Sequence, residues 1–123
     1  MLIGLLTVNF NPNEELIQKP TKVQVEDKKL YAADMDADKE GMITKTFVIT
    51  NYSNEEVKIL DVNPHCSCTG YTLVKDLLKP KEKTELKLSV SLSQLKNLKK
   101  TYAVIKTDGN PKLLVATIMF SEK

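Results

Sequence analysis

Short segments of alternating apolar and polar residues recur along this chain, separated by residues that favour turns. Residues 86–92, with the sequence LKLSVSL, alternate without an exception. Because successive side chains of a strand point to opposite faces, this pattern predicts strands that are buried on one face. Helical periodicity is nearly absent. Leu92, Leu95 and Leu98 are spaced three apart, which predicts one helical or 3₁₀ turn within residues 93–100.

The alternation predicts about seven strands. They cover residues 21–25, 30–33, 45–50, 57–62, 86–92, 102–107 and 113–120, whereas residues 71–78 are ambiguous. We expect Asn63 and Pro64 to break the fourth of these strands, because proline has no N–H to donate to a ladder. This number of short strands favours an all-β fold, an immunoglobulin-like β-sandwich of about seven strands.

Turn-forming residues connect the expected strands. A polar connection over residues 34–41 is closed by Gly41, and residues 79–83 and 108–111 form further turns. Residues 51–55, rich in asparagine and serine, are interpreted as a hairpin connection. No repeat or low-complexity segment interrupts the pattern, so residues 21–123 are expected to form one sandwich domain.

Residues 1–20 are treated separately, as an N-terminal extension or a first strand. Residues 2–8 are apolar but too few to span a bilayer, and they lack the basic leading region and cleavage site of a signal peptide. They fit the remnant of a signal peptide, a short first strand or a start-site artefact. This chain is therefore expected to contain no membrane span.

Composition narrows the function classes. The 123 residues carry 18 basic and 16 acidic side chains, a net charge of only +2, so charge gives no argument for a nucleic-acid partner. The lysines of residues 79–87 and 96–106 are interspersed with acidic residues and are interpreted as solvated strand faces and loops. No phosphate-binding loop or paired-carboxylate motif is present.

The chemically distinctive element is His65-Cys66-Ser67-Cys68-Thr69. In an extended strand the Cα atoms of residues i and i+2 lie roughly 6.6 Å apart, near the upper end of disulfide geometry. A bridge between Cys66 and Cys68 therefore needs a bent strand. We favour the interpretation that the two sulfurs form a local disulfide, or are small buried residues, that shape the strand end.

Three other interpretations of this element remain open. His65, Cys66 and Cys68 would suit copper(I), or zinc with a fourth ligand. The two thiols could also exchange with other disulfides, although the spacing differs from the Cys-x-x-Cys of thioredoxin-like folds. A catalytic thiol is the least favoured, because His65 precedes Cys66 directly and points to the opposite strand face.

Two further patterns are weak. Asp34, Asp36 and Asp38 alternate like the start of a calcium loop, but Gly41 is two residues late and the distal glutamate is missing, so a polar loop is favoured. Asn51-Tyr52-Ser53 fits a glycosylation sequon, and a turn is the preferred interpretation.

The order of several elements resembles a bacterial family common in Bacteroidetes, domain of unknown function 1573, from about Lys22 to Phe120. The elements are FVITN at 47–51, VKI at 57–59, CSCT at 66–69, LKPK at 78–81, LKLSVSL at 86–92 and the segment 105–119. Ser67 and Lys81 stand where the family pattern has glycine, so a positive φ would be strained there. The resemblance implies an immunoglobulin-like sandwich exported to the periplasm or cell surface, and no established activity.

These observations predict a non-catalytic binding or assembly module, without a cofactor, that presents loops or a free edge strand to another protein at the cell envelope. The alternative, from a different class, is a redox-active or copper(I)- or zinc-handling protein that uses Cys66 and Cys68, with His65 as a third ligand. We do not expect an enzyme or a nucleic-acid-binding protein.

Overall fold

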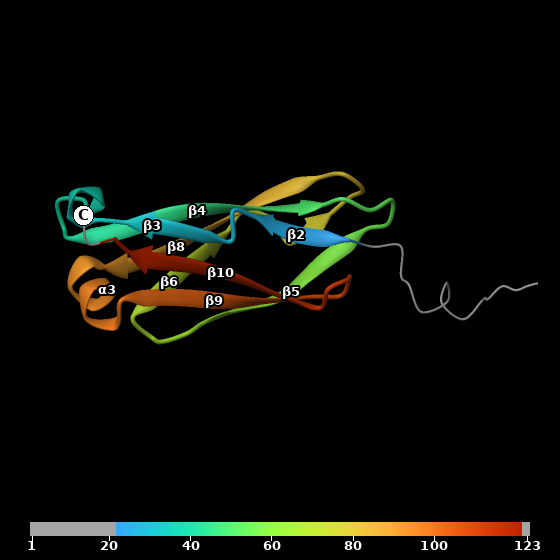
Figure 1. Ribbon diagram of the computed structural model, residues 1–123. Coiled ribbons are helices and arrows are strands. Elements are labelled where there is room, and N and C mark those ends of the chain that lie inside the picture. The colour runs from blue at the N-terminus through green and yellow to red at the C-terminus, as the bar shows by residue number, and fades with distance from the viewer. Residues whose placement is uncertain (1–21, 122–123) are drawn as a thin grey trace, which may run out of the picture.

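The computed structural model describes residues 22–121, which form two β-sheets packed face to face (Figure 1). The four-stranded sheet has the order β2-β4-β8-β6, and the five-stranded sheet has the order β3-β10-β9-β5-β7. The strands are β2 Val23–Glu26, β3 Lys29–Ala32, β4 Met42–Asn51, β5 Val57–Pro64, β6 Thr69–Leu73, β7 Leu77–Leu78, β8 Lys83–Ser91, β9 Lys100–Thr107 and β10 Leu113–Phe120. The predicted all-β sandwich is confirmed.

The strand order is that of an immunoglobulin-like domain. Antiparallel pairing joins neighbouring strands throughout, except that β3 and β10 are parallel. If β2 is named A, β4 B, β8 E and β6 D, then the four-stranded sheet reads A-B-E-D, and β5, β9 and β10 are C, F and G of the other sheet. The chain between β2 and β3 leaves the first sheet for the second, so the first strand is shared between both.

One hydrophobic core fills the space between the sheets. Along β8 the buried and exposed residues alternate over the whole strand, as its sequence predicts. The largest fully buried side chains are Phe47, Ile43, Ile49, Leu78, Leu86, Leu88, Leu95, Ile105, Ile118, Val23, Val57 and Val90. Burying an aliphatic or aromatic side chain of this size stabilises the fold by about 1.5–3 kcal/mol.

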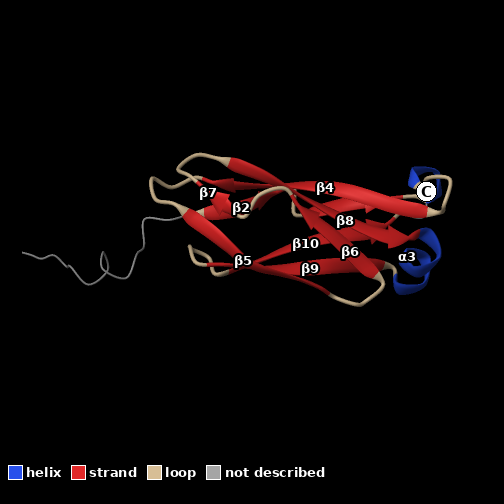
Figure 2. Cartoon of the chain, turned by 180° about the vertical axis from the view of Figure 1, so that it is seen from behind, coloured by secondary structure: helices blue, strands red, loops and turns tan. Residues whose placement is uncertain are grey.

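Two short helical elements lie at one end of the sandwich, and the β9–β10 turn lies at the other (Figure 2). The expected helical turn is the helix α3, Leu92–Leu98, which buries Leu95. Its N-cap Ser91 accepts a hydrogen bond from the backbone of Gln94, and its C-cap Lys99 adopts a left-handed conformation with φ of 74°. The 3₁₀ turn η1, Asp34–Asp36, interrupts the polar connection after β3.

Two sequence-based predictions about connections are wrong. Residues 51–55 do not form a hairpin, because β4 and β5 belong to different sheets and this segment crosses between them. The strand that begins at Val57 does not break at Asn63: β5 continues through Pro64, which is paired with Ala103. The backbone N–H of His65 points to β9, where it donates to the Tyr102 carbonyl. Because successive residues of a strand point their N–H groups to opposite edges, the nitrogen of Pro64 faces the edge of β5 away from β9, where no donor is needed.

The ambiguous residues 71–78 contain most of β6 and all of β7, which raises the strand count of the described residues from the expected seven to nine. Both are edge strands at which few side chains are buried, and therefore the apolar alternation that marks a strand is weak. The extension expected at residues 1–20 lies outside the described residues.

The two positions where serine and lysine replace a family glycine differ in backbone conformation. Lys81 has a φ of 67°, in the left-handed region that glycine adopts without strain, whereas Ser67 is not among the described residues with positive φ. The expected strain therefore applies to Lys81 alone.

Candidate functional site

The cysteine element occupies a bend where the chain crosses from β5 in one sheet to β6 in the other. Cys66 and Cys68 form a disulfide, and their Cα atoms lie 5.2 Å apart, closer than in an extended strand. The backbone of Thr69 donates to the carbonyl of Cys66 at 3.2 Å, which closes the turn. Both cysteines are partly exposed at the protein surface.

His65 is held against Tyr102 of β9. The two rings stack with their centroids 4.6 Å apart and their planes inclined by 17°, and the His65 backbone donates to the Tyr102 carbonyl. Within residues 22–121, no three His, Cys, Asp or Glu side chains are grouped so that they could hold a metal ion. The structure therefore does not arrange His65, Cys66 and Cys68 as a ligand set, and the bridged sulfurs present no thiolate.

Thr69, the last residue of the cysteine element, connects the two sheets. Its Oγ1 lies 2.6 Å from Oγ1 of Thr101 on β9, and both threonines are buried. The same oxygen lies 3.7 Å from the sulfur of Cys66 and 3.7 Å from that of Cys68. The disulfide therefore covers a buried hydrogen bond between the sheets.

Asn51, at the end of β4, is a second buried polar link. Its Nδ2 donates to the backbone carbonyls of Glu55, Leu78 and Lys79, at 2.8, 3.1 and 3.2 Å, and its Oδ1 accepts from the backbone and hydroxyl of Ser53. The side chain is fully buried and ties β4 to β7 of the other sheet. A glycan on this nitrogen is incompatible with the fold, since the nitrogen is enclosed and both its protons are in use.

The aspartates that resemble a calcium loop are engaged in local contacts. Asp36 accepts a hydrogen bond from the backbone of Ala33, and Asp38 accepts from the backbones of Glu40 and Met42. Asp34 forms an exposed ion pair with Lys96 of α3, with 3.3 Å between Oδ2 and Nζ. These contacts support the interpretation of a polar loop.

Exposed hydrogen bonds shift the pKa values of two carboxyl groups, those of Glu26 and Glu82. The hydroxyl of Tyr52 donates to Glu26, which lowers the pKa of Glu26 below its ordinary 4.5 and raises the pKa of Tyr52 above its ordinary 10.0. The hydrogen bond from Lys75, at 2.6 Å, and the one from the backbone of Lys79 likewise lower the pKa of Glu82.

The outer edge of β10 is covered along only half of its length. β3 pairs with residues 117–120, so residues 113–116 have no strand partner on that side among the described residues. The backbone of Val23 donates to the Asn110 carbonyl at one end of the gap, and that of Thr117 donates to the Lys28 carbonyl at the other. Between these two hydrogen bonds the chain turns away to pair with β4.

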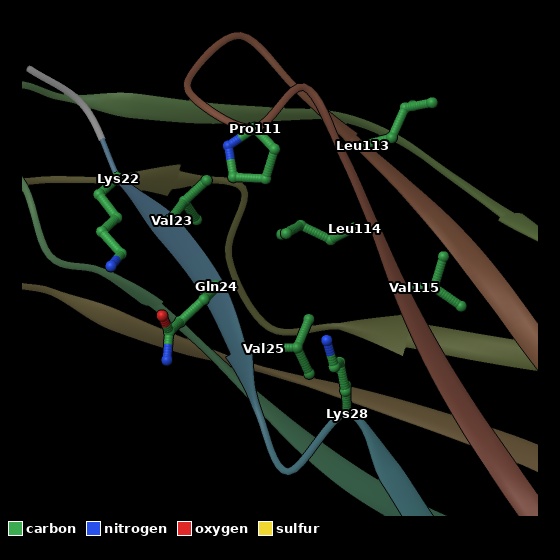
Figure 3. A pocket seen from close by; sticks show the side chains of 9 residues that line it. All are labelled: Lys22, Val23, Gln24, Val25, Lys28, Pro111, Leu113, Leu114 and Val115. Carbon is green, nitrogen blue, oxygen red and sulfur yellow. The ribbon is translucent and has the colours of Figure 1, made fainter. Parts of the chain in front are cut away.

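A groove opens where β2 and β10 diverge, with a volume of about 510 Å³. Val23, Val25 and Leu114 are turned toward this space, with Pro111 at one end and the amine of Lys28 at the other (Figure 3). These three apolar side chains belong to the core, so the groove reaches the interior between the sheets. Its volume is within the usual range of ligand sites.

Comparison with known proteins places the chain in a family. The sequence matches the family described as "Protein of unknown function (DUF1573)" over residues 23–119. The chain belongs to the DUF1573 family. The resemblance seen in the sequence is thus confirmed. A search of curated proteins returned no match.

This DUF1573 domain is also similar to a solved structure, the "Crystal structure of protein of unknown function from Porphyromonas gingivalis W83". The TM-score is 0.65 at 13% sequence identity, with 97% of this chain and 54% of that chain covered. The domain therefore spans about half the length of the Porphyromonas protein. At this identity the likeness shows a shared fold.

Sequence reasoning about this DUF1573 domain found the cysteine element and missed three features. Thr69 and Thr101 are 32 residues apart, and nothing local indicates that their hydroxyls meet. Asn51 was interpreted as a surface turn residue, although the family pattern of an alternating strand that ends in asparagine was a usable signal. The groove was not predicted, because it depends on the place where one edge strand changes sheets.

Two other hollows lie on the described surface. One, of about 560 Å³, is lined by Ser93, Gln94, Lys96 and Asn97 of α3, which are exposed polar residues. The other, of about 320 Å³, lies at the opposite edge of the sandwich, between β5 and β6. Among these hollows, the β2–β10 groove is the one that combines a core-lined floor with an open strand edge. No helix among the described residues has the length and apolar character needed to cross a bilayer.

Proposed function

We propose that this DUF1573 domain is a non-catalytic binding or assembly module of the cell envelope that binds an extended segment of another protein along the open edge of β10. The observation that carries the proposal is the incomplete cover of β10: β3 pairs with residues 117–120, and no described strand pairs with residues 113–116 on the same side. An open edge of this kind is a template for pairing with another chain.

The backbone groups at this edge support pairing with a partner strand. Because the N–H of Thr117 points to β3, the N–H groups of Val115 and Leu113, two and four residues earlier, face the same edge. An added strand would receive hydrogen bonds from these groups, in the manner of peptide recognition by β-augmentation. Each such bond contributes about 0.5–1.5 kcal/mol net, and apolar burial in the groove adds to this.

The cysteine element supports a non-catalytic role and an exported location. Both sulfurs are bonded to each other, and the only histidine of the chain stacks on Tyr102, so neither is arranged as a nucleophile or base. Disulfides persist in oxidising compartments such as the bacterial periplasm and the cell surface. Cell fractionation checks the location: recovery in the cytosol with both cysteines reduced contradicts it.

Photo-crosslinking in cells tests the binding edge. A photoreactive amino acid placed at Val115 should form an adduct with a distinct envelope protein, since this exposed side chain borders the open edge. The matched control carries the same group at Thr44, an exposed position on the other sheet. Equal adduct formation from both positions, or none from Val115, contradicts the proposal.

A redox role is a second candidate, favoured by the partly exposed disulfide between residues only two apart. In exchange, one thiolate of a partner dithiol attacks a sulfur of the Cys66–Cys68 bridge, which forms a mixed disulfide and releases the other cysteine as a thiolate. The second thiol of the partner then attacks the mixed disulfide, so the partner acquires the disulfide and both cysteines of this chain become thiols. Incubation with a reduced dithiol protein, followed by alkylation and mass spectrometry, measures this transfer. No transfer above that of a Cys66→Ser/Cys68→Ser variant contradicts the redox role.

A further inference from the structure

We infer that the groove between β2 and β10 selects its partner by charge as well as by shape: it takes an extended segment of another protein in which one β-branched apolar residue has an acidic residue beside it, at the end of the groove where Lys28 lies. This inference rests on the proposed function, since it names the chemistry of the segment that the open edge of β10 would bind.

The number of partner residues that the open edge of β10 can pair with follows from the hydrogen bonds at its two ends. The hydrogen bond from Val23 to Asn110 closes one end and that from Thr117 to Lys28 closes the other, so residues 113–116 of β10 lie between them without a strand partner among the described residues. At about 3.3 Å per residue, a strand of four residues spans about 13 Å. The open edge therefore pairs with four or five residues of a partner, and a longer segment must leave the edge at both ends.

The apolar position follows from the alternation of β10. Leu114 and Ala116 are buried in the core, whereas Leu113 and Val115 are exposed, so an added strand also has one face turned inward and one outward. An inward side chain beside Leu114 would contact Val23 and Val25 on the floor of the groove. Valine or isoleucine suits this place, because β-branched residues favour strands and fill a space between sheets.

The acidic position follows from Lys28 at the rim of the groove. Lys22 and Lys28 line the groove from the two ends of β2, and no acidic residue is part of the lining. Neither lysine forms an ion pair with another described residue. Figure 3 shows the ammonium group of Lys28 beside Val25, within the space between β2 and β10, whereas the Lys22 side chain lies on the other side of β2 with Gln24. The Lys28 ammonium, which has no ion pair among the described residues, therefore favours a carboxylate beside the inserted residue at this end of the groove.

The test uses the full chain and two synthetic pentapeptides with blocked ends, Asp-Glu-Val-Glu-Asp and its basic counterpart Lys-Lys-Val-Lys-Lys. Peptide is titrated into ¹⁵N-labelled protein, and the backbone amide shifts of Leu113 and Val115 are followed by NMR. We expect the acidic peptide to shift these two amides and to bind about fivefold more tightly than the basic peptide. The preference should shrink as salt is added.

Two sets of variants separate charge from edge pairing. In Lys28→Glu the preference should reverse toward the basic peptide, whereas in Lys87→Glu, a control at an exposed lysine of β8, it should be unchanged. Val115→Pro removes one edge N–H and should abolish binding of both peptides, while Val115→Ala keeps this N–H and should retain it. The amide spectrum of each variant reports whether it is folded.

Each remaining outcome contradicts a defined part of the inference. Equal binding of both peptides, still lost in Val115→Pro, overturns the charge selection and leaves the proposed edge binding standing. If neither peptide shifts the amide resonances of Leu113 and Val115, the charge selection and the proposed edge binding are both contradicted. If these amide resonances shift with protein concentration alone, the strand that pairs with the edge belongs to a second copy of the chain. If residues 1–20 are found in contact with Val115, the chain covers its own edge. Either result overturns binding of another protein.

Discussion

Oγ1 of Thr69 and Oγ1 of Thr101 lie 2.6 Å apart in the interior of the sandwich, one on each sheet. The residues come from β6 and β9, which share no ladder, so this hydrogen bond joins the sheets directly. The Cys66–Cys68 disulfide lies over it, with both sulfurs 3.7 Å from Oγ1 of Thr69. The threonine after the second cysteine thus has a structural role of its own.

Replacing Thr69 by valine, which has nearly the same shape, should destabilise the domain by about 1–3 kcal/mol, because Oγ1 of Thr101 then loses this buried partner. Urea unfolding measures the change. The double variant Thr69→Val/Thr101→Val should lose less than the sum of the two single losses, since no hydroxyl is left unpaired. The exposed Thr72→Val on the same strand is the control, and a loss there equal to that of Thr69→Val contradicts the assignment.

Asn51→Ala should be among the most destabilising single changes, at about 2–4 kcal/mol. The substitution leaves the carbonyls of Leu78 and Lys79 and the hydroxyl of Ser53 without their Asn51 partner in a buried place. Asn54→Ala, three residues along in an exposed position, is the matched control and should change stability by less than about 0.5 kcal/mol. Thermal or urea unfolding of the two variants side by side gives the comparison, and equal losses speak against the buried role.

Lys81→Gly should be more stable than Lys81→Ala by about 0.5–1 kcal/mol, because the φ of 67° strains any residue with a Cβ. Both variants remove the hydrogen bond from Nζ of Lys81 to the Tyr52 carbonyl, so their difference isolates the backbone conformation. The same pair of changes at Lys83, within β8, should give the opposite order, since glycine weakens a strand interior. A more stable alanine variant at position 81 contradicts the left-handed conformation.

Tyr52→Phe should flatten the pH dependence of stability on both sides of neutrality. The folded-state pKa of Glu26 is lowered by the Tyr52 hydroxyl, so its contribution is present above pH 4.5 and is lost as pH falls through the folded-state value. The pKa of Tyr52 is raised by Glu26, so its contribution is present below pH 10.0 and is lost as pH rises through the folded-state value.

The advantage of the parent protein over Tyr52→Phe should therefore be largest between about pH 5 and 9, measured by urea unfolding across the pH range. Part of the acid dependence remains in the variant, because Lys75 still lowers the pKa of Glu82. Tyr31→Phe, at an exposed tyrosine of the other sheet, should show no such profile. If the difference in unfolding free energy between the parent protein and Tyr52→Phe does not vary with pH, the hydrogen bond between Tyr52 and Glu26 is excluded.

The double variant Cys66→Ser/Cys68→Ser should fold and lose less than about 2 kcal/mol, because a bridge between residues two apart removes little entropy from the unfolded chain. We expect a smaller loss than for Asn51→Ala. Addition of reductant to the parent protein should lower its stability by a similar amount, and the double variant should not respond to reductant. A double variant that fails to fold contradicts this estimate.

The sequence alone predicted the strands whose two faces differ. In β8 and β10 the apolar residues alternate with polar or exposed ones, and a period of two residues indicates which side chains enter the core. The same local chemistry identified the turn between β9 and β10, the leucines of α3 and the cysteine pair, all of which depend on residues close together in the chain. It also carried the family resemblance, because the motifs keep their order from residue 47 to residue 119.

Tertiary structure decided which strands are neighbours. Alternation specifies a buried face but not the strand that lies alongside, so it could not reveal that residues 51–55 cross between sheets or that Pro64 remains within β5. The same limit explains why the link between Thr69 and Thr101 was not foreseen. The groove beside β10 exists because the first strand divides between two sheets, and hydrogen bonds between residues far apart in the chain determine where that division falls.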